Sequence, residues 1–496
     1  PKTGGINLHS DQRTFIRAVG RFHSMYGVFV RGYGKCVAGD TMVYTKDGIK
    51  EIGEFFNYYK GKSEEWIGVD NLDVINRYGV LEKVSSLYYG GYKNTKKIIT
   101  EFGYDVEGTL NHPLLILDKD GLIKWRNIED IKVGDFVVVN RNNDVWGNKD
   151  DIDKSKELKL WVNTLSKQSS SHLKITDMPK ILDDNLSLFF GYLVGDGCLT
   201  RDNVILFSNK DKDIINNFKE IAEIYFNTDV NKVKGNNVDY VIYNKYLRKY
   251  LEVLGFELVG AHNKSIPKCI LSGSKSNVAN FLKGLFDTDG YVGRHTVVYY
   301  TVSEKLAKQV QFLLLNFGIL SSRRKKTNKH NQSHWLVAIT GSNIDIYASN
   351  IGFSSNIKKS KLLKYVGIKR NTNKDIIPHQ KNIINGFYHD IKKYNKYIYR
   401  EIHHVIRGDN ELTYDKLNKL LSFDNADKCD NYKHLKELQS LNYFFAKVED
   451  IQDNLNYTYD LSLPLTHSFV SNGIVSHNTF LEVLIMYGMC CLYPGI

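Results

Sequence analysis

Two junctions, one near each end of the chain, carry the residue types that the cleavage of a peptide bond by its own side chains requires. Near the end, Asn478 follows His477 and precedes the hydroxyl residue Thr479. An asparagine amide can attack its own backbone carbonyl and cut the chain by closing a succinimide, provided that a neighbouring histidine supplies or polarises protons. Near the beginning, the Cys36 thiol can take the Lys35 acyl group from nitrogen to sulfur. The junctions together predict that residues 36–478 excise themselves and join Lys35 to Thr479.

Short motifs flank both junctions in an order that a chance match does not explain. The front carries Cys36-Val37-Ala38-Gly39-Asp40-Thr41, and the back carries Asn472-Gly473-Ile474-Val475-Ser476-His477-Asn478-Thr479. A lone His-Asn-Thr is usually a turn or a helix cap. The combination resembles the terminal blocks of inteins. That resemblance implies a thioester at Cys36, transfer to Thr479, cyclisation of Asn478 and an oxygen-to-nitrogen acyl shift, with no metal or nucleotide required.

A third motif, Thr109-Leu110-Asn111-His112-Pro113, lies between two strand-like runs and resembles an internal intein block. The resemblance implies that His112 Nδ1 contacts the amide nitrogen that joins Lys35 to Cys36. It also implies that Thr109 helps to hold a twisted peptide bond there. A histidine before proline in a loop is more often structural, so this role depends on the other blocks.

Two polar residues in the last strand-like runs complete the set that the resemblance assigns. Asp460 would hold or deprotonate Cys36 between steps, and His467 would assist the cyclisation of Asn478. Both also suit ordinary polar strand positions. Apolar and polar residues alternate from Cys36 to about Val139, with Gly and Asp between the runs, which predicts short strands and turns. The sheet would close only with the runs after residue 441.

The residues outside the two junctions form a second pattern when they are read as one continuous chain. Arg31-Gly32-Tyr33-Gly34-Lys35 would then be followed by Thr479 and a helical stretch. A strand, a glycine turn, Lys-Thr and a helix make a phosphate cradle, in which Lys35 reaches ATP phosphate and Thr479 ligates magnesium. The first glycine of that loop is replaced by Phe29. The flanks resemble the large terminase subunits of tailed phages, which implies an ATP-binding host restored only after splicing.

Between the two halves, the sequence contains an internal repeat. The apolar stretches 186–197 and 278–290 both end in Asp-Gly, at Asp196 and Asp289, which lie 93 positions apart. A strand, a helix and another strand follow each stretch. Gly191 and Gly284 would let the two helices pack closely, which brings the two carboxylates together as a magnesium site for phosphodiester hydrolysis.

The paired Asp-Gly helices resemble the two motifs of LAGLIDADG homing endonucleases. The resemblance implies a saddle of strands in the major groove of double-stranded DNA. It also implies an assisting lysine near each carboxylate. Lys264 matches one of these lysines, and Lys358 or Lys359 matches the other, with Lys359 taken as the site residue. Solvated surface positions are the alternative for all three lysines.

The fold class that follows is multidomain, with an all-β, horseshoe-like splicing domain built from both ends of the insert, an α/β endonuclease domain with an αββαββ pseudo-repeat, and a small helical subdomain. The resemblance implies that the helical subdomain adds DNA contacts, although core aromatics explain its tyrosines as well. The expected boundaries are 1–35 and 479–496 for the host flanks, 36–145 and 441–478 for the splicing halves, 146–180 for a linker, 181–370 for the endonuclease and 371–440 for the helical subdomain.

Composition sets the remaining bounds. The 496 residues are 42% hydrophobic and carry a formal net charge of +12, which is ordinary globular content with a modest preference for polyanions. Six scattered cysteines without a zinc spacing are typical of a reducing cytoplasm. No membrane span is expected, and the excised segment is expected to be a monomer. Two alternatives stay open: a splicing element whose nuclease only binds DNA, and a host ATPase with a regulatory insert.

Overall fold

The computed structural model describes residues 35–59, 66–141, 143–166, 173–201, 203–328, 331–368, 375–394 and 398–478. Apart from Lys35, the flanks that resemble an ATPase lie outside these residues, and so does Thr479. The chain divides into two compact units. Unit 1 comprises residues 1–43, 51–140 and 375–496, and unit 2 comprises residues 44–50 and 141–374.

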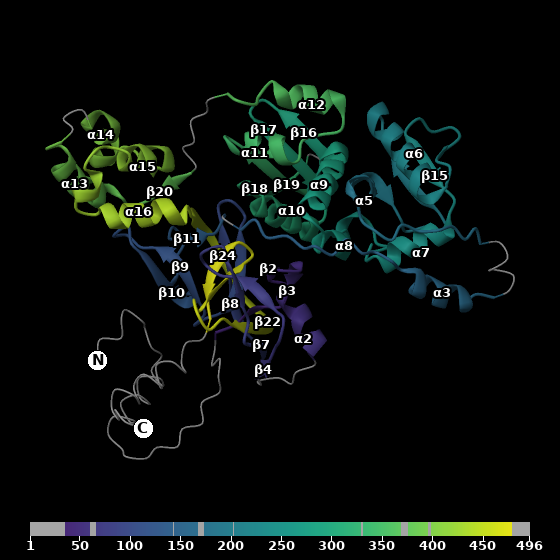
Figure 1. Cartoon of the computed structure of the whole chain (residues 1–496), viewed down its shortest axis with the longest axis horizontal. Coiled ribbons are helices and arrows are strands. Elements are labelled where there is room, and N and C mark those ends of the chain that lie inside the picture. Colours follow the sequence, from purple (N-terminus) through teal and green to yellow (C-terminus); the bar gives the residue numbers. More distant parts are fainter. Residues whose placement is uncertain are drawn as a thin grey trace, which may run out of the picture. The chain divides into compact units, whose positions relative to one another are not determined.

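Unit 1 is built on a ten-stranded sheet whose strands come from both ends of the chain. Its order is β10-β9-β24-β11-β22-β1-β8-β7-β4, with β23 paired to β24. The strands before the insert are β1 (Val37–Ala38), β4 (Trp66–Gly68), β7 (Ser86–Thr100), β8 (Asp105–Thr109), β9 (Pro113–Leu117), β10 (Ile123–Asn127) and β11 (Phe136–Val139). The strands after it are β22 (Phe444–Ser462), β23 (Ser468–Ser471) and β24 (Ile474–His477). Figure 1 shows the yellow β22 and β24 among the purple and blue strands.

The long strand β22 joins the two sets of strands. Its first residues, 444–447, pair with β11, and residues 448–462 pair with β7. Such long-range pairing needs partners from before and after the insert, as the sequence pattern predicts for closure of the sheet. A smaller sheet has the order β3-β2-β5-β6, with β2 (Met42–Thr45), β3 (Gly48–Glu51), β5 (Asp73–Ile75) and β6 (Leu81–Lys83), and helix α2 (Ile52–Tyr59) follows β3.

The helical segment after the insert belongs to unit 1. It contains β20 (Ile376–Ile377), α13 (Lys381–Ile391), α14 (Tyr399–Arg407), β21 (Leu412–Thr413), α15 (Tyr414–Leu421) and α16 (Tyr432–Leu441). Phe387 and Leu417 of these helices share one hydrophobic core with Leu115, Phe445 and Val475 of the sheet. The segment predicted as a separate subdomain is therefore packed onto the sheet, because its amphipathic helices bury their apolar faces there.

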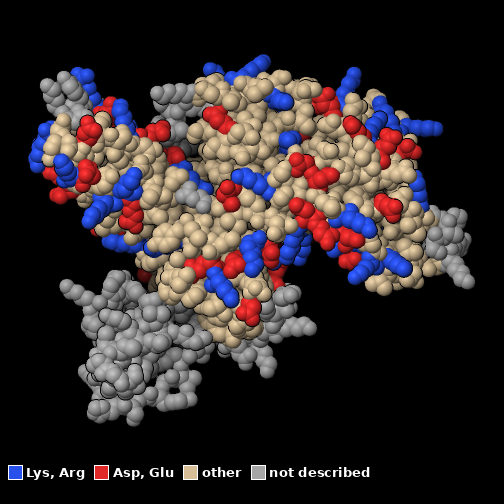
Figure 2. All heavy atoms as spheres, viewed as in Figure 1, with Lys and Arg blue, Asp and Glu red and all other residues tan. Residues whose placement is uncertain are grey.

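The polar surface of the helical segment mixes both signs of charge. On the face in view, Lys and Arg alternate with Asp and Glu over α13–α16 (Figure 2). One of its tyrosines, Tyr414, is buried and donates a hydrogen bond of 2.6 Å to the Tyr443 carbonyl oxygen. Core packing thus accounts for this aromatic residue.

Unit 2 contains two copies of an αββαββ arrangement. The first copy has α5 (Asp184–Asp196), β12 (Gly197–Cys198), β13 (Ile205–Ser208), α6 (Lys212–Phe226), β14 (Asn231–Lys232), β15 (Asp239–Ile242) and then α7 (Lys245–Val253). The second has α9 (Lys275–Asp289), β16 (Gly290–Gly293), β17 (Thr296–Thr301), α10 (Glu304–Asn316), β18 (Ser321–Thr327), β19 (Ser333–Thr340) and then α11 (Asn343–Asn350). Each copy forms a four-stranded sheet, β12-β13-β15-β14 or β16-β17-β19-β18. The connecting helices are α3 (Ser155–Asn163), α8 (Lys268–Leu271) and α12 (Asn356–Leu363).

Helices α5 and α9 pack together at their glycines. A Cβ atom on Gly191 would lie 2.2 Å from the Phe281 carbonyl oxygen, and one on Gly284 would lie 2.3 Å from the Leu188 carbonyl oxygen. No side chain fits at either distance, so only glycine allows the backbones to approach this closely. The close packing that the repeat predicts is therefore present, and it brings the C-terminal ends of both helices together.

Candidate active sites

In unit 1, strand register places Cys36 between two residues that the sequence singles out. Val37 of β1 pairs with Tyr459 of β22 on one side and with Gly108 of β8 on the other. One step back along β1, the same antiparallel registers bring Cys36 opposite Asp460 and Thr109. Residues more than 70 positions apart in sequence thus become neighbours because β1 is a central strand.

Hydrogen bonds hold the Cys36 backbone against Thr109. The Cys36 N–H donates to Thr109 Oγ1 at 3.0 Å, and the Thr109 N–H donates to the Cys36 carbonyl oxygen at 2.9 Å. The junction peptide that ends in this N–H therefore has a side-chain acceptor, as the predicted role of Thr109 requires.

The Cys36 thiol lies in a closed environment. The residue is fully buried, and a Cβ atom on Gly90 would lie 2.8 Å from its sulfur. Burial, followed by the charge of Asp460, raises the pKa of this thiol well above its ordinary value. Cys36 is therefore a neutral thiol at rest, and a base must take its proton before it can act as a nucleophile.

His112 ends the turn that joins β8 to β9, and its ring is fully buried. Neither ring nitrogen has a hydrogen-bond partner among the described residues. Burial, and then the charge of Lys35, lower the pKa of His112 to about 3, so the ring is neutral. The predicted contact of His112 with the junction amide is absent here, because that N–H donates to Thr109.

A buried, unpaired imidazole costs free energy unless another state of the site uses it. Among the described residues, His112 is such an imidazole.

Asn478 is fully buried at the other junction. Its backbone N–H donates to the His467 carbonyl oxygen at 3.0 Å, and its Nδ2 donates to the Leu463 carbonyl oxygen at 3.4 Å. The side-chain oxygen Oδ1 has no partner among the described residues. The amide that would attack is thus held through its nitrogen and nowhere else.

His477 and His467 flank this asparagine. Their rings lie 6.5 Å apart between centroids, and the edge of Trp125 packs against His477 at 4.7 Å. Burial, and then Lys35, lower the pKa of His477 to about 3, whereas burial lowers that of His467 and Glu82 raises it in part. His467 has a left-handed backbone, φ 49°, which turns the chain sharply before β23.

The two junctions converge on one cluster. Ser476 of β24 pairs with Leu114 of β9, so the strand that leads to Asn478 lies beside the strand that follows His112. The charge of Lys35 lowers the pKa of His112, His467 and His477 alike, which requires all three rings to be near it. The first and last residues of the predicted insert therefore meet around His112.

In unit 2, the carboxylates at the ends of α5 and α9 interact. Burial, and then Asp196, raise the pKa of Asp289 to about 7. Burial also raises the pKa of Asp196, which accepts a 2.6 Å hydrogen bond from Asn209 Nδ2. A carboxylate whose pKa is raised by burial and by a neighbouring carboxylate favours the binding of a cation.

Each carboxylate has a lysine beside it. Lys264 Nζ donates to the carbonyl oxygens of Val194 (2.7 Å), Gly195 (2.7 Å) and Gly197 (2.9 Å) at the end of α5. Lys358 Nζ donates in the same way at the end of α9, to Phe286 (3.1 Å), Asp287 and Thr288 (3.3 Å). Each lysine ammonium group offsets the partial negative charge of the helix C-terminus that it contacts.

The second lysine beside the carboxylates is Lys358 and not Lys359, which the sequence analysis took as the site residue. Lys358 contacts the α9 carbonyls, and Lys359 is exposed one residue further along α12. Consecutive helical residues point about 100° apart, so only one of the two can face α9. The sequence left both open because it does not give the phase of α12.

Asp287 is a buried acid at this site that the sequence analysis missed. It accepts hydrogen bonds from the backbone N–H groups of Ser354 (3.1 Å) and Ser355 (3.2 Å) and from the Ser354 hydroxyl. Burial raises its pKa to about 6. Since Ser355 caps α12, Asp287 fixes the helix that carries Lys358. Its repeat counterpart is Val194, and this break in the repeat was the available signal.

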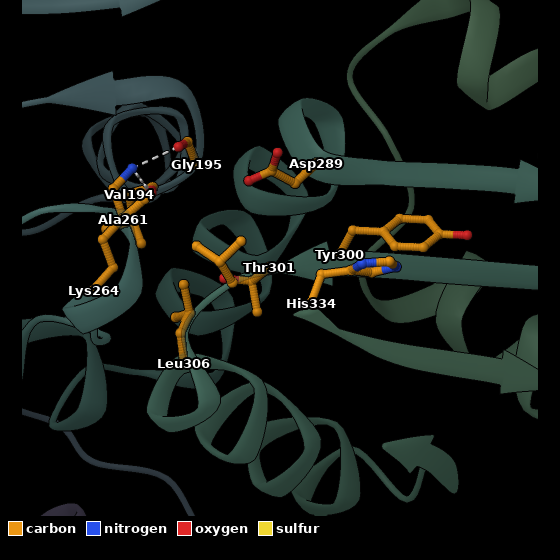
Figure 3. Close-up of a pocket in the computed structure, with 10 residues that line it drawn as sticks. Val194, Gly195, Ala261, Lys264, Asp289, Tyr300, Thr301, Leu306 and His334 are labelled. Atoms are coloured by element: carbon orange, nitrogen blue, oxygen red, sulfur yellow. Dashed lines mark hydrogen bonds between the residues drawn. The ribbon is translucent and has the colours of Figure 1, made fainter. Parts of the chain in front are cut away.

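A cavity of about 280 Å³ opens beside Asp289 and Lys264. Figure 3 shows the Asp289 carboxylate at one side, with the Tyr300 and His334 rings further along and the Lys264 ammonium turned to the carbonyls of Val194 and Gly195. The cavity gives space and access beside one of the two carboxylates.

The donor set fits a hard divalent cation. Asp196 and Asp289 supply carboxylate oxygens, the type of ligand that Mg²⁺ prefers together with water and substrate phosphate. Within the described ranges, no group of three or more His, Cys, Asp or Glu side chains could hold a metal. A cation here would therefore need oxygen atoms from water or from a phosphodiester.

Residues 276–352 match the family model described as "LAGLIDADG-like domain". This stretch of the chain is thus similar to that family. The match covers the second copy of the repeat, from α9 to the end of α11.

Curated relatives match larger parts of the chain. The replication factor C small subunit of Methanocaldococcus jannaschii is 31% identical over 363 residues, which are 71% of this chain and 18% of the relative. The replicative DNA helicase DnaB of Synechocystis is 26% identical over 80% of this chain and 44% of the relative. The glutamine–fructose-6-phosphate aminotransferase of M. jannaschii is 24% identical over 61% and 28%. The chain spans less than half the length of these relatives.

Solved structures include I-DmoI in complex with DNA and Ca, at 15% identity and a TM-score of 0.28, which covers 37% of this chain and 98% of that one. The TvoVMA intein has 23% identity and a TM-score of 0.19, and covers 22% and 71%. The terminase assignment of the flanks finds no support in the relatives, which bear other names. None of the helices in the described part of the chain has the length and apolar character needed to span a membrane.

Proposed function

We propose that residues 36–478 are a self-splicing element that joins Lys35 to Thr479, with an embedded DNA endonuclease. The observation that carries the splicing proposal is the convergence of both junctions on His112. Cys36 is adjacent to Thr109 at the start of this turn, and β24, which leads to Asn478, pairs with β9, which follows the turn.

In this proposal, the Cys36 sulfur attacks the Lys35 carbonyl carbon, and the amide nitrogen of Cys36 leaves as an amine. Thr109 holds that nitrogen, and the neutral, unpaired His112 relays a proton to it, taking one up at one ring nitrogen as it gives one from the other, so that the net change moves the thiol proton to the departing amine. Asp460 accepts the thiol proton. The Thr479 hydroxyl then takes the acyl group from sulfur, and Asn478 cyclises with His477 and His467 beside it. Intramolecular positioning supplies effective molarities of roughly 10⁵–10⁸ M.

The unrelated names of the relatives support the proposal that this segment is an inserted element found in different host proteins. One stretch of this chain matches a replication factor C subunit, a helicase and an aminotransferase. These proteins have unrelated names, and an inserted segment shared between hosts would produce such matches.

Intact mass of the expressed chain tests the splicing proposal. The expected products are the excised 36–478 segment and a joined flank peptide in which Lys35 precedes Thr479. Precursors with Cys36→Ala or Asn478→Ala should not ligate. If the unchanged chain and Asn478→Ala both remained at their full-length, uncut masses, splicing would be refuted.

For unit 2, we propose Mg²⁺-dependent cleavage of both strands of a specific DNA site, expected to be the uninterrupted host gene around the junction. Asp196 and Asp289 would hold the metal, which when bound would supply Lewis-acid chemistry for phosphodiester hydrolysis. The exposed Arg324, Lys325 and Lys326 of β18 would contact phosphates. Cleavage of a plasmid that bears the joined sequence, lost in Asp196→Asn and Asp289→Asn, is the expected result. Binding without cleavage would favour the DNA-binding-only alternative.

The host is proposed to be a nucleotide-binding protein in which ligation of Lys35 to Thr479 completes a phosphate loop. ATP with Mg²⁺ should bind the ligated flanks of a full-length host and not the unspliced chain. ATP binding by the Asn478→Ala precursor would instead favour a regulatory insert in an ATPase.

A further inference from the structure

The backbone from Leu463 to His467, called here the 463–467 loop, holds Asn478 in place. The carbonyl oxygens of Leu463 and His467 accept from the side-chain and backbone nitrogens of Asn478, at 3.4 and 3.0 Å. The His467 N–H closes the loop on the Leu463 carbonyl oxygen at 3.2 Å. The position of the attacking amide therefore depends on the shape of this loop.

A carboxylate from a distant strand fixes the other side of the loop. Glu82 of β6 is 5% exposed, and its Oε1 accepts from the N–H groups of Leu465 (2.7 Å) and Thr466 (3.1 Å). Its Oε2 accepts from the Thr466 hydroxyl (2.6 Å) and from Asn76 Nδ2 (3.2 Å). Four donors surround one side chain, and three of them belong to the 463–467 loop.

Burying an ionised glutamate is costly unless hydrogen bonds satisfy its carboxylate oxygens. Burial raises the pKa of Glu82, but its hydrogen bonds with Thr466, Leu465 and Asn76 together outweigh burial, so its net shift is downward. Glu82 is thus a carboxylate at neutral pH. Its charge also acts on the imidazole of His467, whose pKa it raises against the effect of burial.

We propose that Glu82 is a positioning residue for the cyclisation of Asn478: it fixes the 463–467 loop, so that the loop carbonyls hold the attacking amide. In that step, Asn478 Nδ2 bonds to the Asn478 carbonyl carbon and loses a proton. The bond to Thr479 breaks, and the departing amine gains a proton. This inference rests on the proposed splicing, and it assigns Glu82 to the second junction only.

Separate assays of the two junctions test this assignment. In an Asn478→Ala precursor, added dithiothreitol cleaves the thioester at Cys36 and reports on the first junction alone. In a Cys36→Ala precursor, slow release after Asn478 reports on the second. Glu82→Gln and Thr466→Val are introduced into both, with Glu107→Gln as the matched control. Glu107 is a glutamate of strand β8 that accepts from Thr95, Asn454 and Asn456 instead.

We expect Glu82→Gln and Thr466→Val to slow release after Asn478 by about tenfold or more, the loss expected for a hydrogen bond to a charged group. Cleavage by dithiothreitol should be unchanged, which also shows that the variants fold. Glu107→Gln should change neither rate. The proposal would be overturned if release after Asn478 were equally fast with Glu82 and with Glu82→Gln. It would also be overturned if Glu82→Gln slowed cleavage equally at both junctions.

A spectroscopic readout separates positioning from general stability. In the Asn478→Ala precursor, the His467 ring resonance should titrate at lower pH with Glu82→Gln than with Glu82, because the neighbouring negative charge is gone. Lys35 and His477, which also affect this ring, are unchanged in both proteins. Thr466→Val keeps the charge and should leave this titration in place.

An unaltered His467 titration in Glu82→Gln would contradict the proposal. If neither parent precursor cleaves, the splicing function itself fails, whereas the titration still decides whether Glu82 acts on His467.

Discussion

The backbone N–H of Cys36 donates a 3.0 Å hydrogen bond to the side-chain hydroxyl of Thr109, 73 positions further along the chain. This bond polarises the nitrogen that must leave when the thiol attacks. Thr109→Val keeps the shape and removes the acceptor, so we expect thiol-induced cleavage at Cys36 to slow by about tenfold, equivalent to about 1–1.5 kcal/mol. Timed cleavage of an Asn478→Ala precursor by dithiothreitol measures the rate.

Thr100→Val is the matched control for this prediction. Thr100 is also buried in the sheet, and its hydroxyl donates to the Tyr104 carbonyl oxygen. It should leave the cleavage rate unchanged, and equal rates for Thr109→Val and Thr100→Val would contradict the role of Thr109.

The contact of α5 with α9 predicts that added volume at the glycines is not tolerated. Gly191→Ala or Gly284→Ala should destabilise unit 2 by about 3 kcal/mol or more, because a methyl group would overlap a backbone carbonyl oxygen. Urea denaturation followed by circular dichroism measures the change. Gly260→Ala is the control, since a Cβ atom there meets nothing within 4 Å. Similar midpoints for all three variants would show that the helices do not pack this closely.

The pair of buried acids predicts how stability depends on pH. Because the pKa of Asp289 is raised to about 7, the folded state binds this proton more tightly than the unfolded chain does. Stability should therefore fall as pH rises from about 4, the unfolded pKa, to about 7. Without metal, Asp289→Asn should raise the melting temperature at pH 8 and have little effect at pH 4.

Magnesium should oppose this loss of stability. At pH 8 it should raise the melting temperature of the unchanged chain and not that of Asp289→Asn. Asp229→Asn, an exposed position, serves as the control. A magnesium response that survives Asp289→Asn would locate the metal elsewhere.

The shared core of unit 1 predicts that the helical segment is required for splicing. Phe387→Ala in α13 should destabilise unit 1 by about 3–5 kcal/mol and slow ligation, because Phe387 belongs to the core that contains the sheet. Phe281→Ala in α9, equally buried, should affect unit 2 instead. Densitometry of spliced product and plasmid cleavage provide the two readouts. Unchanged ligation in Phe387→Ala would mean that the helices fold independently.

Motifs that act through local spacing could be predicted from the sequence. The repeat that ends in Asp196 and Asp289 gave the helix pair and its glycines, because close helix packing leaves a small-residue signature. The sequence motifs around Cys36 and Asn478 predicted the positions of the two junctions. These features depend on residues that are near one another in sequence or on a detectable repeat.

Features that depend on long-range packing could not be predicted in the same way. Glu82 meets its loop across more than 380 positions, and a glutamate in a strand is ordinarily exposed. The helix that decides between Lys358 and Lys359 has a phase set by its cap at Ser355, which Asp287 holds. The sequence predicted the helical segment as a separate subdomain. An amphipathic pattern shows that one face of a helix is buried, but it does not show which surface buries that face.

In the proposed splicing, the sheet of unit 1 would also determine when the reaction can begin. Strand β1, which carries the first junction, is held in place by β22, which is made some 400 residues later. While the ribosome is still producing the insert, Cys36 has no Asp460 beside it. The proposed splicing would therefore not cut a half-made chain, since Cys36 acquires its surroundings only when translation has passed the last strand.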